Sequence, residues 1–186
     1  MVELIHTEIA AVLVLQAPRF GDDRGFFSET FRSEWLPGEQ FVQDNHSMSA
    51  TPGTVRGLHF QIEEAAQGKL VRVPRGAVLD VAVDVRAGSP TFGESVSRVL
   101  SAYNWEQLWV PPGFAHGFCT LEPNTEVLYK VTSYYSPQLE RGLAWDDPAL
   151  GIAWPEEAGA VVSERDRQWP VLADLPGYFR YEEGKS

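Results

Sequence analysis

The chain has 186 residues, 44% of them hydrophobic and 12% aromatic, which suits one folded domain with a sizeable core. Its formal net charge of −11 gives a surface that repels phosphate backbones, so broad nucleic-acid binding is excluded. The single cysteine, Cys119, rules out an internal disulfide, and no apolar run is long enough for a membrane span.

The first half of the chain alternates short strand patterns with turns. Glu3, His6 and Glu8 stand where a signal peptide would be apolar, so we expect a cytoplasmic protein without a membrane segment. Residues 10–15 form an aliphatic strand pattern, and an Asp-Asp-Arg-Gly turn at residues 22–25 leads into an aromatic strand. Residues 33–40 predict a short helical turn, and the polar segment 41–49 follows.

The middle of the chain is predicted to be β structure. In residues 77–86, Ala77, Leu79, Val81, Val83 and Val85 fall on one face and the alternate residues on the other. Pro- and Gly-rich turns separate such strands, and no long amphipathic helix lies between them. The pattern favours a single all-β domain, either a sandwich or a jelly-roll barrel, with a loosely attached polar tail from about residue 174.

The strand-like run 53–61 carries the first candidate functional residues. Arg56 and His59 are costly in an apolar strand unless each has a partner or a function there. Strict alternation puts them on opposite faces, but Gly57 between them is typical of a bulge that shifts the side-chain phase by one. The polar residues expected to point into a barrel are Arg56, His59, Lys69, Asp80, His116 and Tyr129.

The available side chains favour acid–base chemistry over other reaction types. Residues 111–116 read Pro-Pro-Gly-Phe-Ala-His, as in a metal-binding cupin motif, but His59 lacks the second histidine and the glutamate that a metal site needs. No serine elbow, glycine-rich phosphate loop or dinucleotide fingerprint is present. A histidine base, a tyrosine acid and a lysine beside an enolate oxygen suit proton abstraction next to a carbonyl and return to the opposite face.

Twelve segments of the chain, in order from about residue 19 to 170, are similar to the dTDP-4-dehydrorhamnose 3,5-epimerase family. They are residues 23–27 (DRGFF), 41–47 (FVQDNHS), 56–61 (RGLHFQ), 67–73 (QGKLVRV), 80–86 (DVAVDVR), 89–93 (SPTFG), 113–118 (GFAHGF), 129–130 (YK), 134–137 (YYSP), 145–148 (WDDP), 152–155 (IAWP) and 163–166 (SERD). The resemblance implies a cupin-like double-stranded jelly-roll barrel with short peripheral helices. It also implies a cofactor-free, metal-free homodimeric enzyme that acts on a dTDP-4-keto-6-deoxyhexose.

The resemblance assigns roles by position. His59 is the implied base with Asp166 as its orienting carboxylate, and Tyr129 is the implied proton donor on the opposite face. Lys69 is expected to stabilise the enolate oxygen, and His116, backed by Asp80, to contact the sugar. The other implied contacts to the nucleotide and diphosphate are Arg24, Glu29, Gln43, Asp44, Asn45, Arg56, Tyr135, Glu140 and Arg165. Arg24 and Glu29 are expected to complete the site of the partner subunit.

Three function classes stay open at this point. The leading one is the double epimerase, which inverts carbons 3 and 5 of dTDP-4-dehydro-6-deoxy-D-glucose to give dTDP-4-dehydro-L-rhamnose. A mono-epimerase acting on a related ketosugar, or a non-catalytic sugar-nucleotide binding module, is the alternative. A metal-dependent cupin enzyme is the third class, disfavoured by the ligand count.

Overall fold

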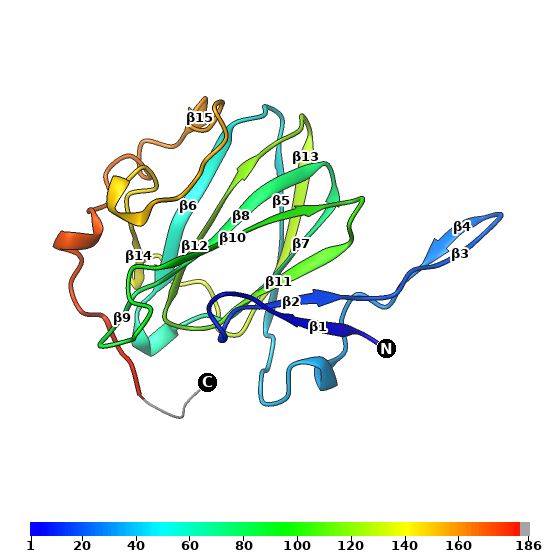
Figure 1. Cartoon of the computed structure of the whole chain (residues 1–186), viewed down its shortest axis with the longest axis horizontal. Helices are drawn as coiled ribbons and strands as arrows, with labels where there is room; N and C mark the ends of the chain where they lie inside the picture. Colours follow the sequence, from blue (N-terminus) through cyan, green and yellow to red (C-terminus); the bar gives the residue numbers. More distant parts are fainter. Residues whose placement is uncertain (183–186) are drawn as a thin grey trace.

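The computed structural model describes residues 1–182 and consists of two facing β-sheets that together form a jelly-roll barrel (Figure 1). The first sheet has the order β1 (Glu3–His6), β2 (Leu13–Gln16), β11 (Glu106–Val110), β7 (Lys69–Arg75), β13 (Thr125–Val131) and β5 (Gln43–Ser49). The second has the order β10 (Ser95–Ser101), β8 (Ala77–Asp84), β12 (Phe114–Thr120), β6 (Thr54–Gln61) and β14 (Glu140–Gly142), with β15 (Val161–Val162) parallel to β6. The predicted all-β, cupin-like fold is confirmed.

Within the described residues, the helices are four 3-10 turns at the periphery: η1 (Ser33–Trp35), η2 (Glu63–Ala65), η3 (Pro148–Leu150) and η4 (Leu172–Asp174). The predicted helical turn at residues 33–40 is present, but it is limited to η1. In residues 1–182 there is no helix with the length and apolar character needed to cross a membrane.

The alternation predicted for residues 77–86 separates two hydrophobic clusters. Val78 and Ala82 on β8 face the interior between the sheets, where they join Val71, Leu108 and other buried residues. Val81 and Val83 point the other way and pack under the C-terminal part of the chain. Because Asp80 has the same parity as Val78 and Ala82, its carboxylate points into the barrel.

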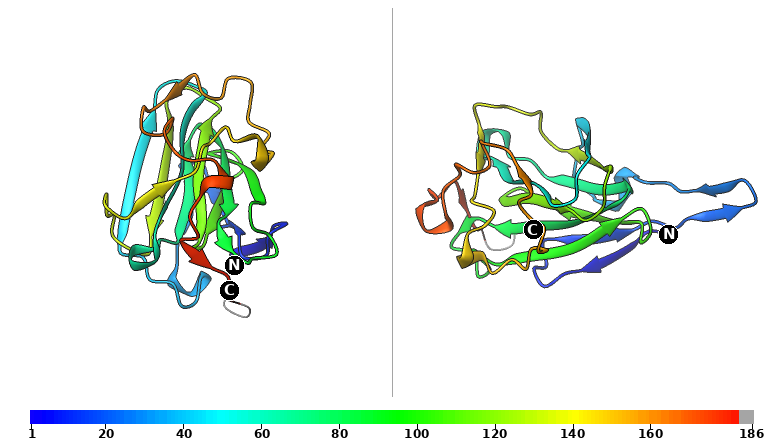
Figure 2. Two further views of the ribbon diagram at one scale, coloured as in Figure 1. Left: turned by 90° about the vertical axis from the view of Figure 1, so that its left-hand side faces the viewer. Right: turned by 90° about the horizontal axis from the view of Figure 1, so that it is seen from above.

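The C-terminal segment covers the outer face of the second sheet (Figures 1 and 2). Phe179 is buried in β16 (Phe179–Arg180), which pairs with β9 (Arg86–Ala87), and its ring lies 5.9 Å from that of Phe60. The prediction of a loosely attached tail from residue 174 is therefore wrong for residues 174–182. The apolar surface of Tyr178 and Phe179 attaches this otherwise polar segment, and residues 183–186 lie outside the described part.

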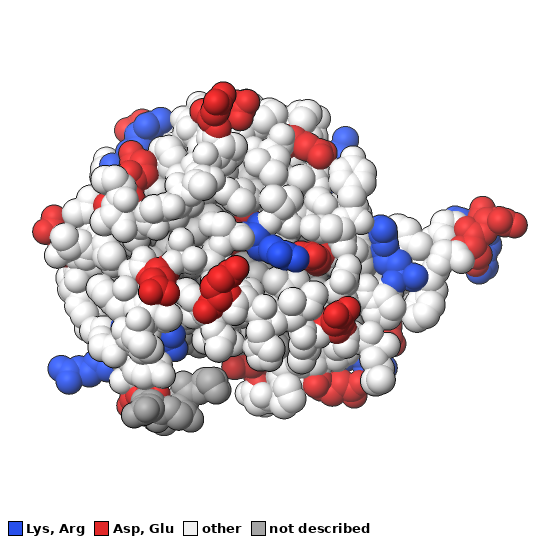
Figure 3. Space-filling model, in the orientation of Figure 1, with Lys and Arg blue, Asp and Glu red and all other residues white. Residues whose placement is uncertain are grey.

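A β-hairpin formed by β3 (Phe20–Asp22) and β4 (Gly25–Phe27) extends away from the barrel (Figures 1 and 2). It carries Phe20, Phe26 and Phe27, which are 63%, 56% and 67% exposed. Acidic and basic side chains are scattered over the face of the barrel in Figure 3, and both signs occur on the tip of this hairpin. Phe26 packs edge-on against Trp105, with ring centroids 5.1 Å apart, yet all three phenylalanines remain more than half exposed and make an apolar surface on one extended hairpin.

The bulge predicted at Gly57 is confirmed. His59 pairs with His116 across β6 and β12, whereas Arg56 pairs with Phe118, so β6 contains one residue more than β12 over this interval. Gly57 has φ +118°, and a Cβ there would lie 2.5 Å from the Cα of Gly117. Both the backbone conformation and the close approach of β12 require glycine.

Candidate active site

The barrel contains a partly open cavity of about 350 Å³. It gathers predicted site residues from both sheets and from the loop before β14: Gln43, Asn45, Arg56, His59, Lys69, His116, Tyr129, Tyr135 and Glu140. The phase shift at Gly57 brings Arg56 and His59 to the same cavity even though they come from one strand.

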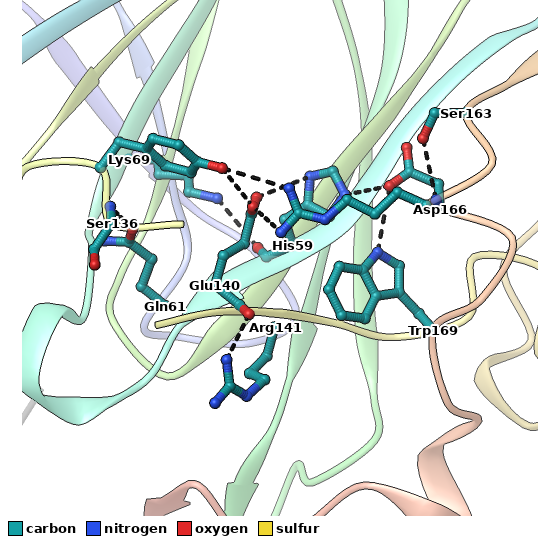
Figure 4. A network of polar contacts seen from close by, with 11 residues as sticks. His59, Gln61, Lys69, Ser136, Glu140, Arg141, Ser163, Asp166 and Trp169 are labelled. Atoms are coloured by element: carbon teal, nitrogen blue, oxygen red, sulfur yellow. Dashed lines mark hydrogen bonds and ion pairs between the residues drawn. The ribbon is translucent and has the colours of Figure 1, made fainter. Parts of the chain in front are cut away.

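His59 is held by the carboxylate of Asp166, which lies 107 residues away in sequence (Figure 4). Its Nε2 is 2.5 Å from Asp166 Oδ1, and the indole N–H of Trp169 donates to the same oxygen over 3.3 Å. Burial raises the pKa of the Asp166 carboxyl, but hydrogen bonds from His59, Ser163 and Trp169 outweigh it and keep that pKa below the usual range. An ionised carboxylate only accepts, so Nε2 carries the hydrogen and Nδ1 is left as the basic nitrogen.

The basic nitrogen of His59 has a second carboxylate near it. Glu140 Oε1 lies 3.9 Å from His59 Nδ1, and Figure 4 shows Glu140 between His59 and Ser136. This distance is too long for a hydrogen bond, so Glu140 does not engage the lone pair of His59 Nδ1.

Lys69 is a buried cation on β7. Its Nζ donates to the backbone oxygen of His59 over 3.1 Å. Burial lowers the pKa of Lys69 from 10.5 to about 8, against the opposing effect of the Glu140 and Asp80 charges. The ammonium group is therefore mostly protonated at neutral pH, but it is poorly solvated and well suited to neutralise a negative oxygen.

His116 is paired with Asp80 on the neighbouring strand β8. His116 Nε2 lies 2.9 Å and 3.0 Å from the two oxygens of the Asp80 carboxylate, and both side chains are buried. The β6–β12 register puts His116 directly across from His59. The carboxylate fixes the orientation of the His116 ring, whose edge lines the cavity.

Tyr129 reaches the same cavity from the opposite sheet, on β13. Burial raises the pKa of its phenol, and Arg56 acts in the opposite direction, while Glu140 and Tyr135 reinforce the increase. The phenol is consequently protonated at neutral pH and able to donate a proton. The imidazole and the phenol therefore enter one cavity from facing sheets.

Three polar side chains are bonded to one another at the opening of the cavity. The Tyr135 hydroxyl donates to Glu140 Oε2 over 2.7 Å, and the Arg165 guanidinium forms an ion pair with the same carboxylate. Arg165 also donates to the Tyr135 hydroxyl over 3.4 Å and lies over the Trp169 ring. This arrangement puts an exposed guanidinium and an aromatic ring beside the entrance.

Five predicted contact residues do not line this cavity: Arg24, Glu29, Asp44, Asp80 and Arg165. Asp80 and Arg165 are bonded to side chains that do line it, His116 for the first and Tyr135 and Glu140 for the second. Asp44 points to the opposite face of β5, where it pairs with Lys130 over 2.8 Å, so its predicted contact with the ligand is not supported. Strict alternation along β5 gives the reason, since Gln43 and Asn45 face inward and the residue between them faces out. Arg24 lies at the hairpin turn, paired with Asp22, and Glu29 lies just after the hairpin, paired with Arg32.

Several residues of the site were not predicted from the sequence. Ser47, Gln67 and Phe118 also line the cavity, and Trp169 supports Asp166. The alternation that places Gln43 and Asn45 inside extends to Ser47, so that residue was predictable. Nothing in the local pattern indicates Trp169. Within the part of the chain that the structure describes, no three His, Cys, Asp or Glu side chains are grouped to hold a metal ion.

A cupin-like jelly roll with a His–Asp pair, a buried lysine and a tyrosine in its barrel defines an enzyme with acid–base residues in its interior. A family model described as dTDP-4-dehydrorhamnose 3,5-epimerase matches residues 6–174. The chain belongs to this family, and it is an isomerase.

Individual relatives agree with this assignment. The chain is 56% identical to the dTDP-4-dehydrorhamnose 3,5-epimerase of Sinorhizobium fredii, over 93% of this chain and 91% of the relative. It is also similar to the crystal structure of dTDP-6-deoxy-D-glucose-3,5-epimerase from Legionella pneumophila in complex with dTDP-4-keto-L-rhamnose. That similarity has a TM-score of 0.92 and 41% identity and covers 98% of this chain and 100% of the other.

A mono-epimerase has the same fold at lower identity. The 3'-monoepimerase from Streptomyces bikiniensis in complex with dTDP-quinovose matches with a TM-score of 0.85 and 33% identity, over 91% of this chain and 87% of the other. The comparisons therefore favour the double epimerases.

Proposed function

We propose that the protein inverts carbons 3 and 5 of dTDP-4-dehydro-6-deoxy-D-glucose and gives dTDP-4-dehydro-L-rhamnose. The observation that supports the proposal most directly is that His59, Lys69 and Tyr129 line one cavity, with His59 oriented by Asp166. These groups supply a base, an enolate stabiliser and an acid. None of the proposed steps needs a cofactor or a metal.

Each inversion consists of two proton transfers. His59 Nδ1 removes the proton from carbon 3, the C–H electron pair forms an enolate through the 4-keto group, and the Lys69 ammonium stabilises the oxygen. The Tyr129 hydroxyl then donates its proton to the opposite face of that carbon. His59 releases its proton to solvent, the tyrosinate takes one from solvent, and the same steps invert carbon 5.

The remaining polar side chains hold the nucleotide and the diphosphate. Arg56 and Arg165 offer guanidinium groups to phosphate oxygens, and Tyr135 offers an aromatic face to the thymine ring. Gln43, Asn45 and Glu140 add polar contacts, and His116 with Asp80 contacts the sugar.

The proposal includes a homodimer in which the hairpin of one subunit reaches the cavity of the other. Two observations support this: the phenylalanines of the hairpin are exposed, and neither Arg24 nor Glu29 lines the cavity of its own chain. A second copy of the chain would cover the apolar hairpin surface and bring Arg24 to the diphosphate. A cytoplasmic location is also part of the proposal, since the only cysteine is free and buried.

Incubation with dTDP-4-dehydro-6-deoxy-D-glucose in deuterated water, followed by NMR of carbons 3 and 5, tests the function. We expect deuterium at both carbons, because each inversion replaces a carbon-bound hydrogen with one from solvent through Tyr129. Label at only one carbon would make the protein a mono-epimerase. Absence of label at both would contradict the proposed reaction.

The His59→Ala variant tests the assignment of the base. We expect it to abolish deuterium exchange and to leave binding of dTDP, measured by calorimetry, nearly unchanged, because His59 lies at the sugar end of the cavity. Exchange at the wild-type rate in this variant would assign the base elsewhere.

A further inference from the structure

Ser47 has a buried hydroxyl that no hydrogen bond within the protein explains. Among residues 1–182, Ser47 Oγ is the one buried side-chain nitrogen or oxygen without a hydrogen-bond partner. A buried unpaired hydroxyl costs free energy that an alanine at the same place would not. Ser47 lines the cavity, so the missing partner belongs to whatever fills it.

The neighbouring inward side chains on β5 differ from Ser47 because each has at least one hydrogen bond within the protein. Asn45 Oδ1 accepts from Gln43 Nε2 over 2.8 Å, and Gln43 Oε1 accepts from the backbone N–H of Tyr135 over 3.1 Å. On the other side, Ser49 Oγ accepts from Arg56 Nε over 3.2 Å. Ser47 is therefore the inward polar side chain of β5 that has no hydrogen bond within the described part of the protein.

The register of β5 fixes the level of Ser47 in the cavity. Asn45 pairs across the sheet with Tyr129, the proton donor, and Ser49 holds Arg56, which binds phosphate in the proposed function. Ser47 lies between them, about 7 Å along the strand from each neighbour. Its hydroxyl is thus at a level between the reacting carbons and the diphosphate.

We propose that Ser47 is a specificity-determining residue whose hydroxyl hydrogen-bonds the 2-hydroxyl of the hexose. This inference rests on the proposed function. In a nucleotide hexose, carbon 1 carries the diphosphate and carbon 3 is inverted, so the hydroxyl on carbon 2 lies between these two levels. The cavity then prefers a 2-hydroxy hexose over a 2-deoxy hexose, because only the former pairs with the buried serine.

Calorimetric binding of dTDP-glucose, dTDP-2-deoxyglucose and dTDP tests this without requiring turnover. We expect wild-type protein to bind dTDP-glucose about five- to tenfold more tightly than dTDP-2-deoxyglucose. In Ser47→Ala this ratio falls to about one, while the affinity for dTDP stays at the wild-type value. The thermal midpoint of the free variant is equal to or above that of wild type, because the unpaired hydroxyl is gone.

The Ser49→Ala variant is the matched control, since Ser49 lies on the same face and its hydroxyl has a protein partner. It is expected to weaken all three ligands alike through Arg56. A Ser47→Ala variant that keeps the wild-type preference, loses affinity for dTDP or unfolds at a lower temperature would overturn the inference. If wild-type protein binds none of the three ligands, the proposed function itself is wrong, whereas equal binding of the two sugars refutes only the role of Ser47.

Discussion

The positive charge of Lys69 is disfavoured because the side chain is buried. Burial lowers its pKa from 10.5 to about 8, so the folded state binds this proton less tightly than the unfolded state does. The resulting destabilisation is fully present below pH 8, decreases as the pH rises and disappears above about 10.5. A pKa shift of this size corresponds to about 3 kcal/mol of destabilisation at neutral pH.

The Lys69→Met variant should therefore be more stable and nearly inactive. We expect its free energy of unfolding at pH 7 to rise by about 1–3 kcal/mol, with a gain that shrinks between pH 8 and 10.5. Activity should fall at least about 10²-fold, because the enolate oxygen loses its cation. Urea unfolding across this pH range measures the first effect, with Lys130→Met, which removes a half-buried lysine paired with Asp44, as control. Lower stability of Lys69→Met at pH 7 would contradict the argument.

Asp166 determines which nitrogen of His59 is basic. The Asp166→Asn variant can present an N–H to Nε2, which would move the ring hydrogen to Nδ1 and leave no lone pair facing the substrate. We expect kcat to fall about 10²–10⁴-fold with little change in the Kd for dTDP. Steady-state kinetics and calorimetry measure the two quantities. A variant with wild-type kcat would show that His59 does not depend on this partner.

At the level of single residues, sequence patterns predict what a strand or a motif carries. They identify His59, Lys69, His116 and Tyr129, which the structure gathers in one cavity. Sequence patterns do not identify Trp169, because its hydrogen bond to Asp166 depends on how a long irregular segment folds back.

Among the elements, β6 depends on a glycine that shifts its side chains by one position. The bulge at Gly57 allows Arg56 and His59 to face one cavity, and its neighbour Gly117 leaves no room for a side chain at position 57. The strand that positions the base therefore lies too close to β12 for any side chain at position 57.

Replacing Gly57 with alanine should damage both stability and activity. We expect a loss of about 2–4 kcal/mol in the free energy of unfolding, from the positive φ and the clash with Gly117 together. The control is Gly88→Ala, which has φ +84° but open space around the new Cβ, so it isolates the cost of the backbone conformation. Chemical denaturation compares the two. If both variants lost the same free energy of unfolding, the clash with Gly117 would contribute nothing.

Sequence patterns at the element scale succeed where one rule acts alone. Alternation predicts the two faces of β8, and a glycine inside a strand predicts the bulge. Alternation also places Asp44, which the family resemblance assigns to ligand contact, on the outer face of the strand beside Lys130. The C-terminal strand β16 was missed, because two aromatic residues in a polar segment are too short a pattern to indicate packing.

At the scale of the whole molecule, the β3–β4 hairpin extends away from the cavity of its own chain, and we expect it to contact the cavity of a second subunit. Its phenylalanines are exposed and Arg24 does not line the cavity of its own chain. The acidic net charge and the strand pattern predict a folded β protein, but the reach of a hairpin depends on its tertiary environment and is not encoded in local periodicity.

Mixing two inactive variants tests the exchange of hairpins. In a dimer that combines Arg24→Ala with His59→Ala, one cavity has both mutations and the other has neither. After unfolding and refolding of an equal mixture, we expect about a quarter of the wild-type activity from random pairing. Each variant refolded alone is the control. No recovery, with heterodimers demonstrated by mass spectrometry, would mean that each hairpin does not complete the site of the other subunit.

The ion pair between Arg165 and Glu140 at the cavity opening affects how long a nucleotide stays bound. An arriving diphosphate competes with a carboxylate that already occupies the guanidinium, and this competition offsets part of the attraction. The same carboxylate can recapture Arg165 when the product begins to leave, which shortens the residence time. We therefore expect this acidic side chain to favour rapid product release over tight retention.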